Sequence, residues 1–350
     1  MAGNIYKIFD NSAITSNVEI VTAPLWPNNM GAISTMASSS TQGENQKRYY
    51  YDVYDKNSEE TGAESIFSVL YADYQNSGSS TGSYGENLED NPTQTLYYQY
   101  RNILLSPEQN LFTFDKGESS EHIYVINVNR SRYKKRIDTG TWQLTIASLN
   151  PVTHEIAASP DYFTFIDDSS GPTVTVSEQG GRTYKIVSGS IKDGIYTSDT
   201  TPWGLFYPDH GVFVFNGNAL DASASFGTPR NPGTSSGDDS AFHFFTSISG
   251  AMAADSASHA FIGASNESIM SSYYYCRINY NEFNYTNNPT YVSGSNSELR
   301  FPEMASQPVV YFTQVGLYSD NNELLAIANL SKPIKKALDR EAVIKIKLDT

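Results

Sequence analysis

Hydrophobic and polar positions are most regularly ordered near the end of the chain. Val309–Tyr318 is an apolar run rich in strand-forming residues, residues 319–322 form a turn-rich cluster, and residues 323–330 are a second apolar run. Two apolar runs on either side of four polar residues predict a β-hairpin. A cation-rich connector follows, and residues 342–348 predict a last strand.

This last strand alternates between two kinds of residue. Positions 343, 345 and 347 are Val, Lys and Lys, whereas positions 344, 346 and 348 are Ile, Ile and Leu. Because successive side chains of a strand point to opposite faces, we predict one buried apolar face and one cationic face. A cationic strand in an acidic chain indicates docking onto another surface.

Short apolar runs also recur along the rest of the chain, separated by Gly, Pro, Asn and Ser. Their intervals of roughly 8 to 12 residues are typical of sandwiches and barrels. Helical spacing is clear only over residues 93–105, before Pro107, and residues 240–249 are a second candidate. We therefore predict a mostly β fold with β-sandwich or barrel-like domains and few short helices.

The composition changes between residues 150 and 160, where Pro and Ser interrupt the strand pattern. The sequence thus predicts an N-terminal β-rich domain over residues 1–150. A C-terminal β-rich domain over residues 160–350 would end in the hairpin and the cationic strand. Two segments rich in Gly and Ser, residues 75–91 and 227–239, are expected to be surface loops.

Composition excludes several classes of protein. The net charge is −15, and a basic face able to bind nucleic acid is not expected. The 25 Tyr and 17 Phe argue against a disordered chain. No apolar run approaches the ~18 residues of a membrane helix, and no secretory leader is evident, so neither a membrane partner nor export is expected. The single cysteine, Cys276, lies in an apolar run and is interpreted as a buried structural thiol in a protein that folds in a reducing cytoplasm.

Catalytic motifs are not found. The five histidines form no HExxH pair, and the chain has no CxxC, no phosphate-binding glycine loop and no GxSxG. Asp167 and Asp168 are interpreted as turn carboxylates, because they match no calcium loop. We therefore expect no catalytic, cofactor-binding or metal-binding residue, and no enzyme.

The cations are concentrated in two short segments. One interpretation is that these are solvated strand ends; the other is that they dock acidic neighbours or copies of the chain. The candidate docking cations are Arg130, Arg132, Lys134, Lys135 and Arg136 in the first segment, and Lys332, Lys335, Lys336, Arg340, Lys345 and Lys347 in the second.

Aromatic residues supply a second candidate surface. Tyr280, Phe283 and Tyr285 lie within six residues, and such amphipathic rings suit protein interfaces. They also suit stacking on a saccharide, and ordinary strand residues with an outward hydroxyl remain the simplest alternative.

Seven stretches spread along the chain carry a family resemblance. They are residues 124–127, 140–145, 186–191, 207–209, 282–291, 315–333 and 344–349. These stretches resemble virion structural proteins of large contractile-tailed bacteriophages, those of marine and cyanobacterial hosts in particular. The resemblance covers most of the chain and is most specific toward its end.

This resemblance implies a non-enzymatic building block of the tail or baseplate, made and assembled in the host cytoplasm. Its expected partners are other phage structural proteins and copies of itself. A receptor- or glycan-binding tail appendage is the main alternative, with a host receptor or glycan as partner. A neck- or capsid-associated structural protein is another.

Overall fold

The computed structural model describes residues 6–26, 37–39, 50–56, 60–75, 92–114, 117–170, 181–191, 195–196, 201, 203–226, 240–254, 261–286, 288–293, 295 and 298–349. The chain divides into two compact units. Unit 1 consists of Met1–Ile20 and Ser268–Thr350, and unit 2 of Val21–Glu267. The chain passes between them within the strands β1 (Ile14–Pro24) and β15 (Ala264–Ile278). Unit 1 is thus built from both ends of the chain.

The division lies elsewhere than the predicted boundary between residues 150 and 160. The strands on either side of that region, β9 (Leu144–Ala147) and β10 (Tyr162–Asp167), are antiparallel neighbours in one sheet. The Pro- and Ser-rich segment is therefore a connection within unit 2. The predicted loops at residues 76–91 and 227–239 lie outside the described residues.

Unit 2 is built on one antiparallel sheet. Its strand order in the described part is β2-β3-β4-β7-β14-β13-β11-β10-β9, with β12 beside β11. The other strands of unit 2, whether in this sheet or outside it, have these bounds: β2 Ala37–Ser39, β3 Tyr50–Tyr54, β4 Ser65–Asp73, β5 Phe112–Thr113, β6 Ser119–Ser120, β7 His122–Val128, β8 Arg136–Ile137, β11 Tyr184–Ser190, β12 Ile195–Tyr196, β13 Gly204–Tyr207 and β14 Val212–Asn216.

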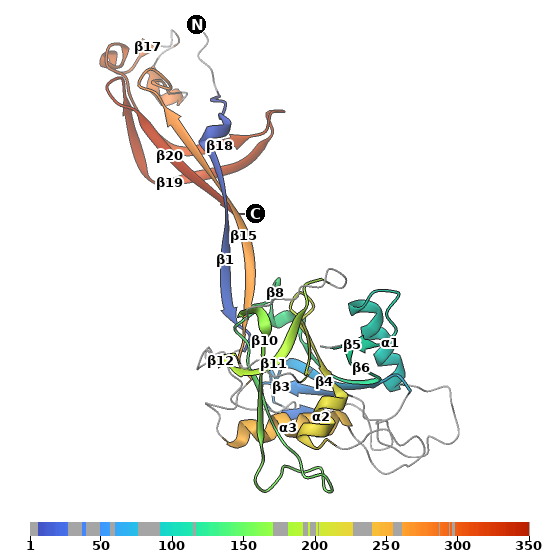
Figure 1. Ribbon diagram of the computed structural model, residues 1–350. Helices are drawn as coiled ribbons and strands as arrows, with labels where there is room; N and C mark the ends of the chain where they lie inside the picture. The colour runs from blue at the N-terminus through green and yellow to red at the C-terminus, as the bar shows by residue number, and fades with distance from the viewer. Residues whose placement is uncertain are drawn as a thin grey trace. The chain divides into compact units, whose positions relative to one another are not determined.

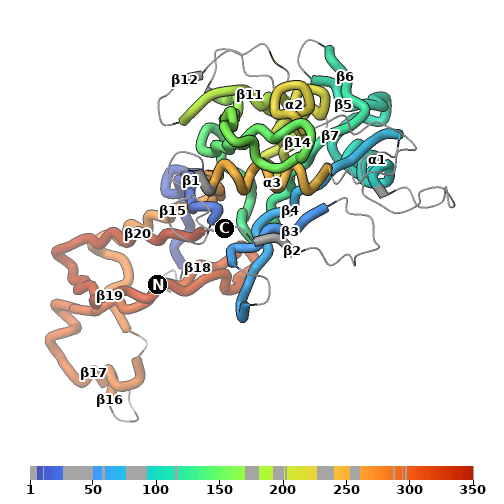
Figure 2. Tube along the Cα trace, turned by 90° about the horizontal axis from the view of Figure 1, so that it is seen from below, coloured from blue at the N-terminus to red at the C-terminus, as the bar shows by residue number. Residues whose placement is uncertain are grey.

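Both faces of this sheet are covered. On β7, Tyr124 and Ile126 face a core that includes residues of α2 (Gly217–Ala224) and α3 (Ser240–Ala254). Ile123 and Val125 face a second core with α1 (Pro92–Leu104). Strands buried on both sides read as continuous apolar runs, which explains the sequence of β7. In both views α1 lies beside β5 and β6 (Figures 1 and 2).

The mostly β fold class is confirmed, with three α helices in the described residues and curled antiparallel sheets. The helix predicted at residues 93–105 is α1, and the second candidate is the start of the longer α3. The pattern did not predict α2, which has only eight residues and begins at a glycine.

Unit 1 contains the predicted hairpin and last strand. Strands β18 (Val309–Tyr318) and β19 (Leu324–Ala337) form an antiparallel ribbon, and β20 (Ala342–Asp349) pairs with β15. On its other side β15 pairs with β1. A short hairpin, β16 (Val292–Ser293) and β17 (Glu298–Leu299), lies between β15 and β18 in the chain.

Strand β19 is longer than expected, since it includes most of the predicted connector. The ladder between the two strands is irregular at one place. Thr313 is the single β18 residue between Phe312 and Gln314, and it lies opposite residues 330–333 of β19, which include Pro333. Proline has no N–H to give to a ladder, so it is tolerated at such an irregularity. In β20 the predicted alternation is confirmed, because Ile344 and Ile346 are buried while Lys345 is exposed.

Candidate assembly surface

The small core of unit 1 determines which side of the β18–β19 ribbon is exposed. Leu317 is buried against Ile344 and Ile346 of β20, and Phe312 and Ala328 pack on the same cluster. Because side chains alternate along a strand, the residues between these positions point away from the core.

The side of the ribbon that points away from this core is rich in apolar side chains. We call it the outer ribbon face and define it by Tyr311, Tyr318, Leu325, Ile327 and Lys335. Leu325 and Ile327 are 67% and 57% exposed, and both tyrosines are exposed as well. Single exposed apolar residues are common in soluble proteins, whereas a group on one face marks an interaction site.

Five of the six predicted cations of unit 1 fall into two groups. Lys332 and Lys335 are exposed on β19 and have no ion-pair partner among the described residues. Three others have partners. Lys345 lies over the ring of Tyr273 at 4.1 Å, Lys347 pairs with Glu19 at 2.9 Å and Arg340 with Asp339 at 3.4 Å.

Lys336 departs from the prediction that it docks a partner. Its side chain is fully buried, and its ammonium donates to the carbonyl oxygens of Tyr280 and Ala337 and to the side-chain oxygen of Asn284. Burial lowers the pKa of this amine. Lys336 therefore holds the loop after β15 onto β19 and is not part of the exposed surface.

The aromatic candidates are also divided. Tyr280 and Tyr285 are exposed, as a docking role requires. Phe283 instead packs on the small core, with a backbone φ of 52° that few non-glycine residues adopt. Its ring stabilises unit 1 and is only partly accessible.

The first cation segment lies in unit 2 and is held by internal partners. It contains the short 3₁₀ turn Arg130–Arg132. Arg130 donates to the carbonyls of Lys134 and Lys135, and the guanidinium of Arg132 lies 2.6 Å from Glu64. Lys134 pairs with Glu267 at 2.8 Å, and Arg136 donates to Asn266 at 3.0 Å. These contacts close the connection between β7 and β8. The first cation segment therefore lies in unit 2, whereas the second lies in unit 1.

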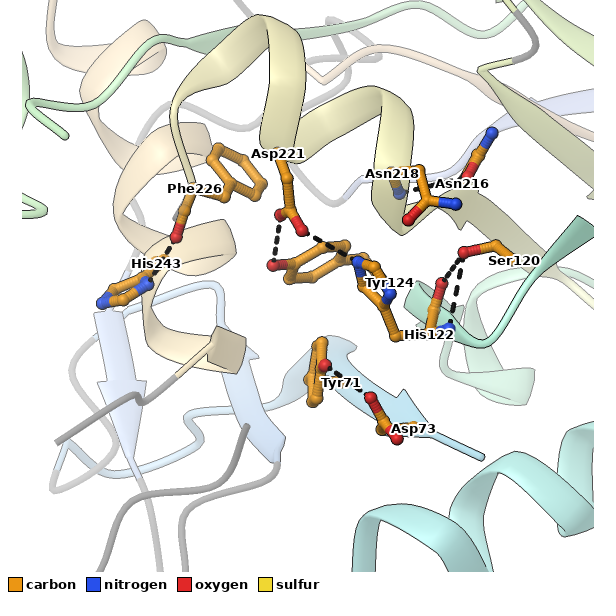
Figure 3. A network of polar contacts seen from close by, with 10 residues as sticks. All are labelled: Tyr71, Asp73, Ser120, His122, Tyr124, Asn216, Asn218, Asp221, Phe226 and His243. Carbon is orange, nitrogen blue, oxygen red and sulfur yellow. Dashed lines mark hydrogen bonds and ion pairs between the residues drawn. The ribbon is translucent and has the colours of Figure 1, made fainter. Parts of the chain in front are cut away.

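Sequence reasoning did not find the buried polar network of unit 2 (Figure 3). Nε2 of His122 lies 2.8 Å from Oδ2 of Asp221, and the hydroxyl of Tyr124 donates to Oδ1 of the same carboxylate at 3.1 Å. These residues are separated by almost 100 positions, and no local signal links them.

This network could be taken for catalytic machinery, but its geometry indicates a structural role. His122 and Tyr124 are buried, and burial raises the pKa of Asp221. Ser120 Oγ donates to the backbone carbonyl of His122 rather than pointing at its ring. The contacts of Asp221 with His122 and Tyr124 therefore tie α2 to β7.

Two further observations concern chemistry. Cys276 is half-buried, and burial raises the pKa of its thiol, which makes the nucleophilic thiolate scarce. Across the described part of the chain, no group of three or more His, Cys, Asp or Glu is arranged to hold a metal ion.

Asp167 and Asp168 are both buried. Asp167 accepts the backbone N–H groups of Gly140 and Ser169, and Asp168 accepts that of Lys185.

Within the described residues, no helix is long and apolar enough to cross a membrane. The chain matches no known protein family, no curated protein and no solved structure.

Proposed function

We propose that this chain is a non-enzymatic structural component of a bacteriophage virion, in the contractile tail or baseplate, and that unit 1 attaches it to neighbouring proteins. The observation that carries the attachment role is the outer ribbon face, where Leu325 and Ile327 lie exposed near Tyr318, and which continues along the ribbon to the paired residues Tyr311 and Lys335. The virion setting is supported by the sequence resemblance alone.

The physical argument for attachment is the mismatch between the core and the surface of unit 1. Its fully buried cluster is small, yet its strands carry many exposed aliphatic and aromatic side chains. A two-stranded ribbon is marginally stable by itself in water. Burial of its outer face against a neighbour would stabilise it by roughly 25 cal/mol per Å² of apolar surface.

The test is incorporation into particles. A tagged chain carrying both Leu325→Ser and Ile327→Ser, supplied during infection by the phage that encodes it, should be lost from purified virions. Val152→Ser is the matched control, because Val152 is an exposed aliphatic residue of unit 2. Wild-type levels of the double variant in particles, or absence of the wild-type chain from virions, would refute the proposal.

Point substitutions are preferable to removal of residues 332–350. That segment includes Ile344 and Ile346, which are buried in the core of unit 1. Its loss would unfold the unit and would not report on docking. Exposed positions avoid this problem, since surface changes usually alter stability by about 0.5 kcal/mol or less.

A receptor- or glycan-binding appendage is the second candidate, and the exposed rings of unit 1 favour it. Tyr280, Tyr285, Phe301 and Tyr311 all present rings to solvent. Aromatic faces are amphipathic and suit a saccharide as well as a protein. Binding of the isolated chain to a glycan array, lost on Tyr280→Ala or Tyr285→Ala, would favour this role over that of a building block.

A further inference from the structure

The three-stranded part of unit 1, formed by β1, β15 and β20, has two chemically different faces. Ser16 Oγ lies 3.4 Å from Ser272 Oγ, which places both side chains on one face. Residues two or four positions away in either strand share that face. We call it the apolar face; it consists of Ile14, Ser16, Val18 and Ile20 of β1 and of Ser268, Met270 and Ser272 of β15.

The large side chains of the apolar face are exposed. Val18, Ile20 and Met270 are 56%, 62% and 52% exposed, and Ile14 is exposed too. The core beneath the ribbon covers only the part of the sheet that contains Ile344 and Ile346. Four neighbouring large apolar side chains on one sheet face form a patch of the kind that mediates association.

The opposite face of the same strands is suited to water. The hydroxyl of Tyr273 donates to Glu19 at 2.7 Å, and Lys347 pairs with the same carboxylate. Arg277 pairs with Glu341 at 2.8 Å. Covering these pairs would desolvate charges without adding partners. The apolar face is the one that gains from burial.

Charge distribution indicates what covers it. Unit 1 contains nine Lys and Arg against ten Asp and Glu, a net charge of −1, so unit 2 carries −14 of the total of −15. Copies of this acidic chain repel one another mainly through unit 2, whereas a nearly neutral unit can associate with itself. None of the seven positions of the apolar face is charged, so two such faces meet without like-charge repulsion.

We propose that the apolar face packs against the same face of a second copy of this chain. This inference rests on the proposed function, since it names the first partner of unit 1 in the assembly. Two sheet faces that bear Ile, Val, Met and Ser interdigitate at the spacing of ordinary sheet packing, about 10 Å. Lys332, Lys335 and the outer ribbon face are not needed for this contact.

The test is the oligomeric state of the full chain, measured by analytical ultracentrifugation over a range of concentrations. The wild type should form an oligomer. The Val18→Ser, Ile20→Ser double variant should dissociate at concentrations at least about tenfold higher than the wild type does, because each aliphatic side chain buried in the contact contributes to the free energy of association. Val343→Ser is the matched control, because Val343 is 60% exposed on the opposite face of the same sheet. It should associate as the wild type does.

A monomeric wild type at every concentration would overturn the inference, as would equal effects of the Val18 and Val343 changes. Circular dichroism melts of all variants separate loss of association from loss of folding. The outcomes also distinguish the two proposals. A monomer that still enters particles refutes self-association alone, whereas a self-associating chain that is absent from virions refutes the proposed function alone.

Discussion

The side-chain ammonium of Lys336 lies 2.8 Å from the side-chain oxygen of Asn284 in the interior of unit 1. Two backbone carbonyls complete its hydrogen bonds, so the charge is satisfied although it is buried. This contact fixes the loop after β15, which carries the exposed rings of Tyr280 and Tyr285.

Lys336→Met should destabilise unit 1 by about 2 kcal/mol, because it removes three hydrogen bonds of the buried ammonium and leaves the side-chain oxygen of Asn284 without this donor. Hydrogen exchange of the β19 amides in the full chain measures this. Lys335→Met is the matched control on the same strand, since Lys335 is exposed and its replacement should change stability by less than about 0.5 kcal/mol. Equal effects of the two substitutions would contradict the structural role of Lys336.

Gly217 is required where α2 begins. A Cβ at this position would lie 2.1 Å from Cδ2 of His122 and 2.6 Å from its carbonyl oxygen. Gly217→Ala should therefore destabilise unit 2 by about 1–3 kcal/mol, although alanine is the better helix former. Denaturant unfolding measures the loss.

Asn218, the exposed residue that follows Gly217, provides the control for the Gly217→Ala change (Figure 3). In Asn218→Ala the backbone N–H that Asn216 caps is retained, so stability should stay within about 0.5 kcal/mol of the wild type. A stable Gly217→Ala protein would show that His122 moves aside at little cost.

Local patterns predicted what depends on neighbours in sequence. The alternation of β20, the turn between β18 and β19, and the spacing of α1 are all set within about a dozen residues. The division into units was not predictable in this way. Unit 1 joins the two ends of the chain through the pairing of β1 with β15, and no periodicity encodes that pairing.

The candidate site was predicted in part for the same reason. Lys332 and Lys335 are exposed as expected, but the sequence predicts a connector over this region, and a connector has no strand alternation that would separate Lys335 from Lys336. In a strand, Lys335 and Lys336 must point to opposite sides, which places Lys336 inside. The contact between His122 and Asp221 is beyond any local pattern, because the fold alone brings the two residues together.

Acid should weaken unit 2 through His243. This side chain is buried on α3, its ring is stacked on that of His154 at 4.3 Å, and burial lowers its pKa to about 4. The unfolded chain therefore binds the proton more readily, and stability is lost as the pH falls from about 6.5 to about 4. The loss should reach about 3 kcal/mol.

His243→Asn should remove this pH dependence, while the same change at the exposed His210 controls for the loss of an imidazole. Urea unfolding at pH 7.5 and pH 4.5 gives the difference between each variant and the wild type. An unchanged pH dependence in the His243 variant would contradict the assignment.

Asp168 should act in the opposite direction. Its Oδ1 accepts the N–H of Lys185 at 2.9 Å, whereas Oδ2 is buried and has no hydrogen-bond partner among the described residues. Burial raises its pKa to about 6, so the folded state holds a proton that the unfolded chain releases near pH 4. The contribution of this group to stability therefore falls as the pH rises from about 4 to about 6, by up to about 3 kcal/mol.

Asp168→Asn should abolish this decrease and raise the free energy of unfolding at pH 7.5 by about 1–3 kcal/mol, because the amide keeps an acceptor for Lys185 and carries no charge. Asp161→Asn is the control, since Asp161 is exposed near the start of the same strand, β10. Taking each variant as a difference from the wild type separates this effect from the opposing one of His243. A less stable Asp168→Asn protein at pH 7.5 would mean that the ionised carboxylate is stabilised by its surroundings, against the geometry described above.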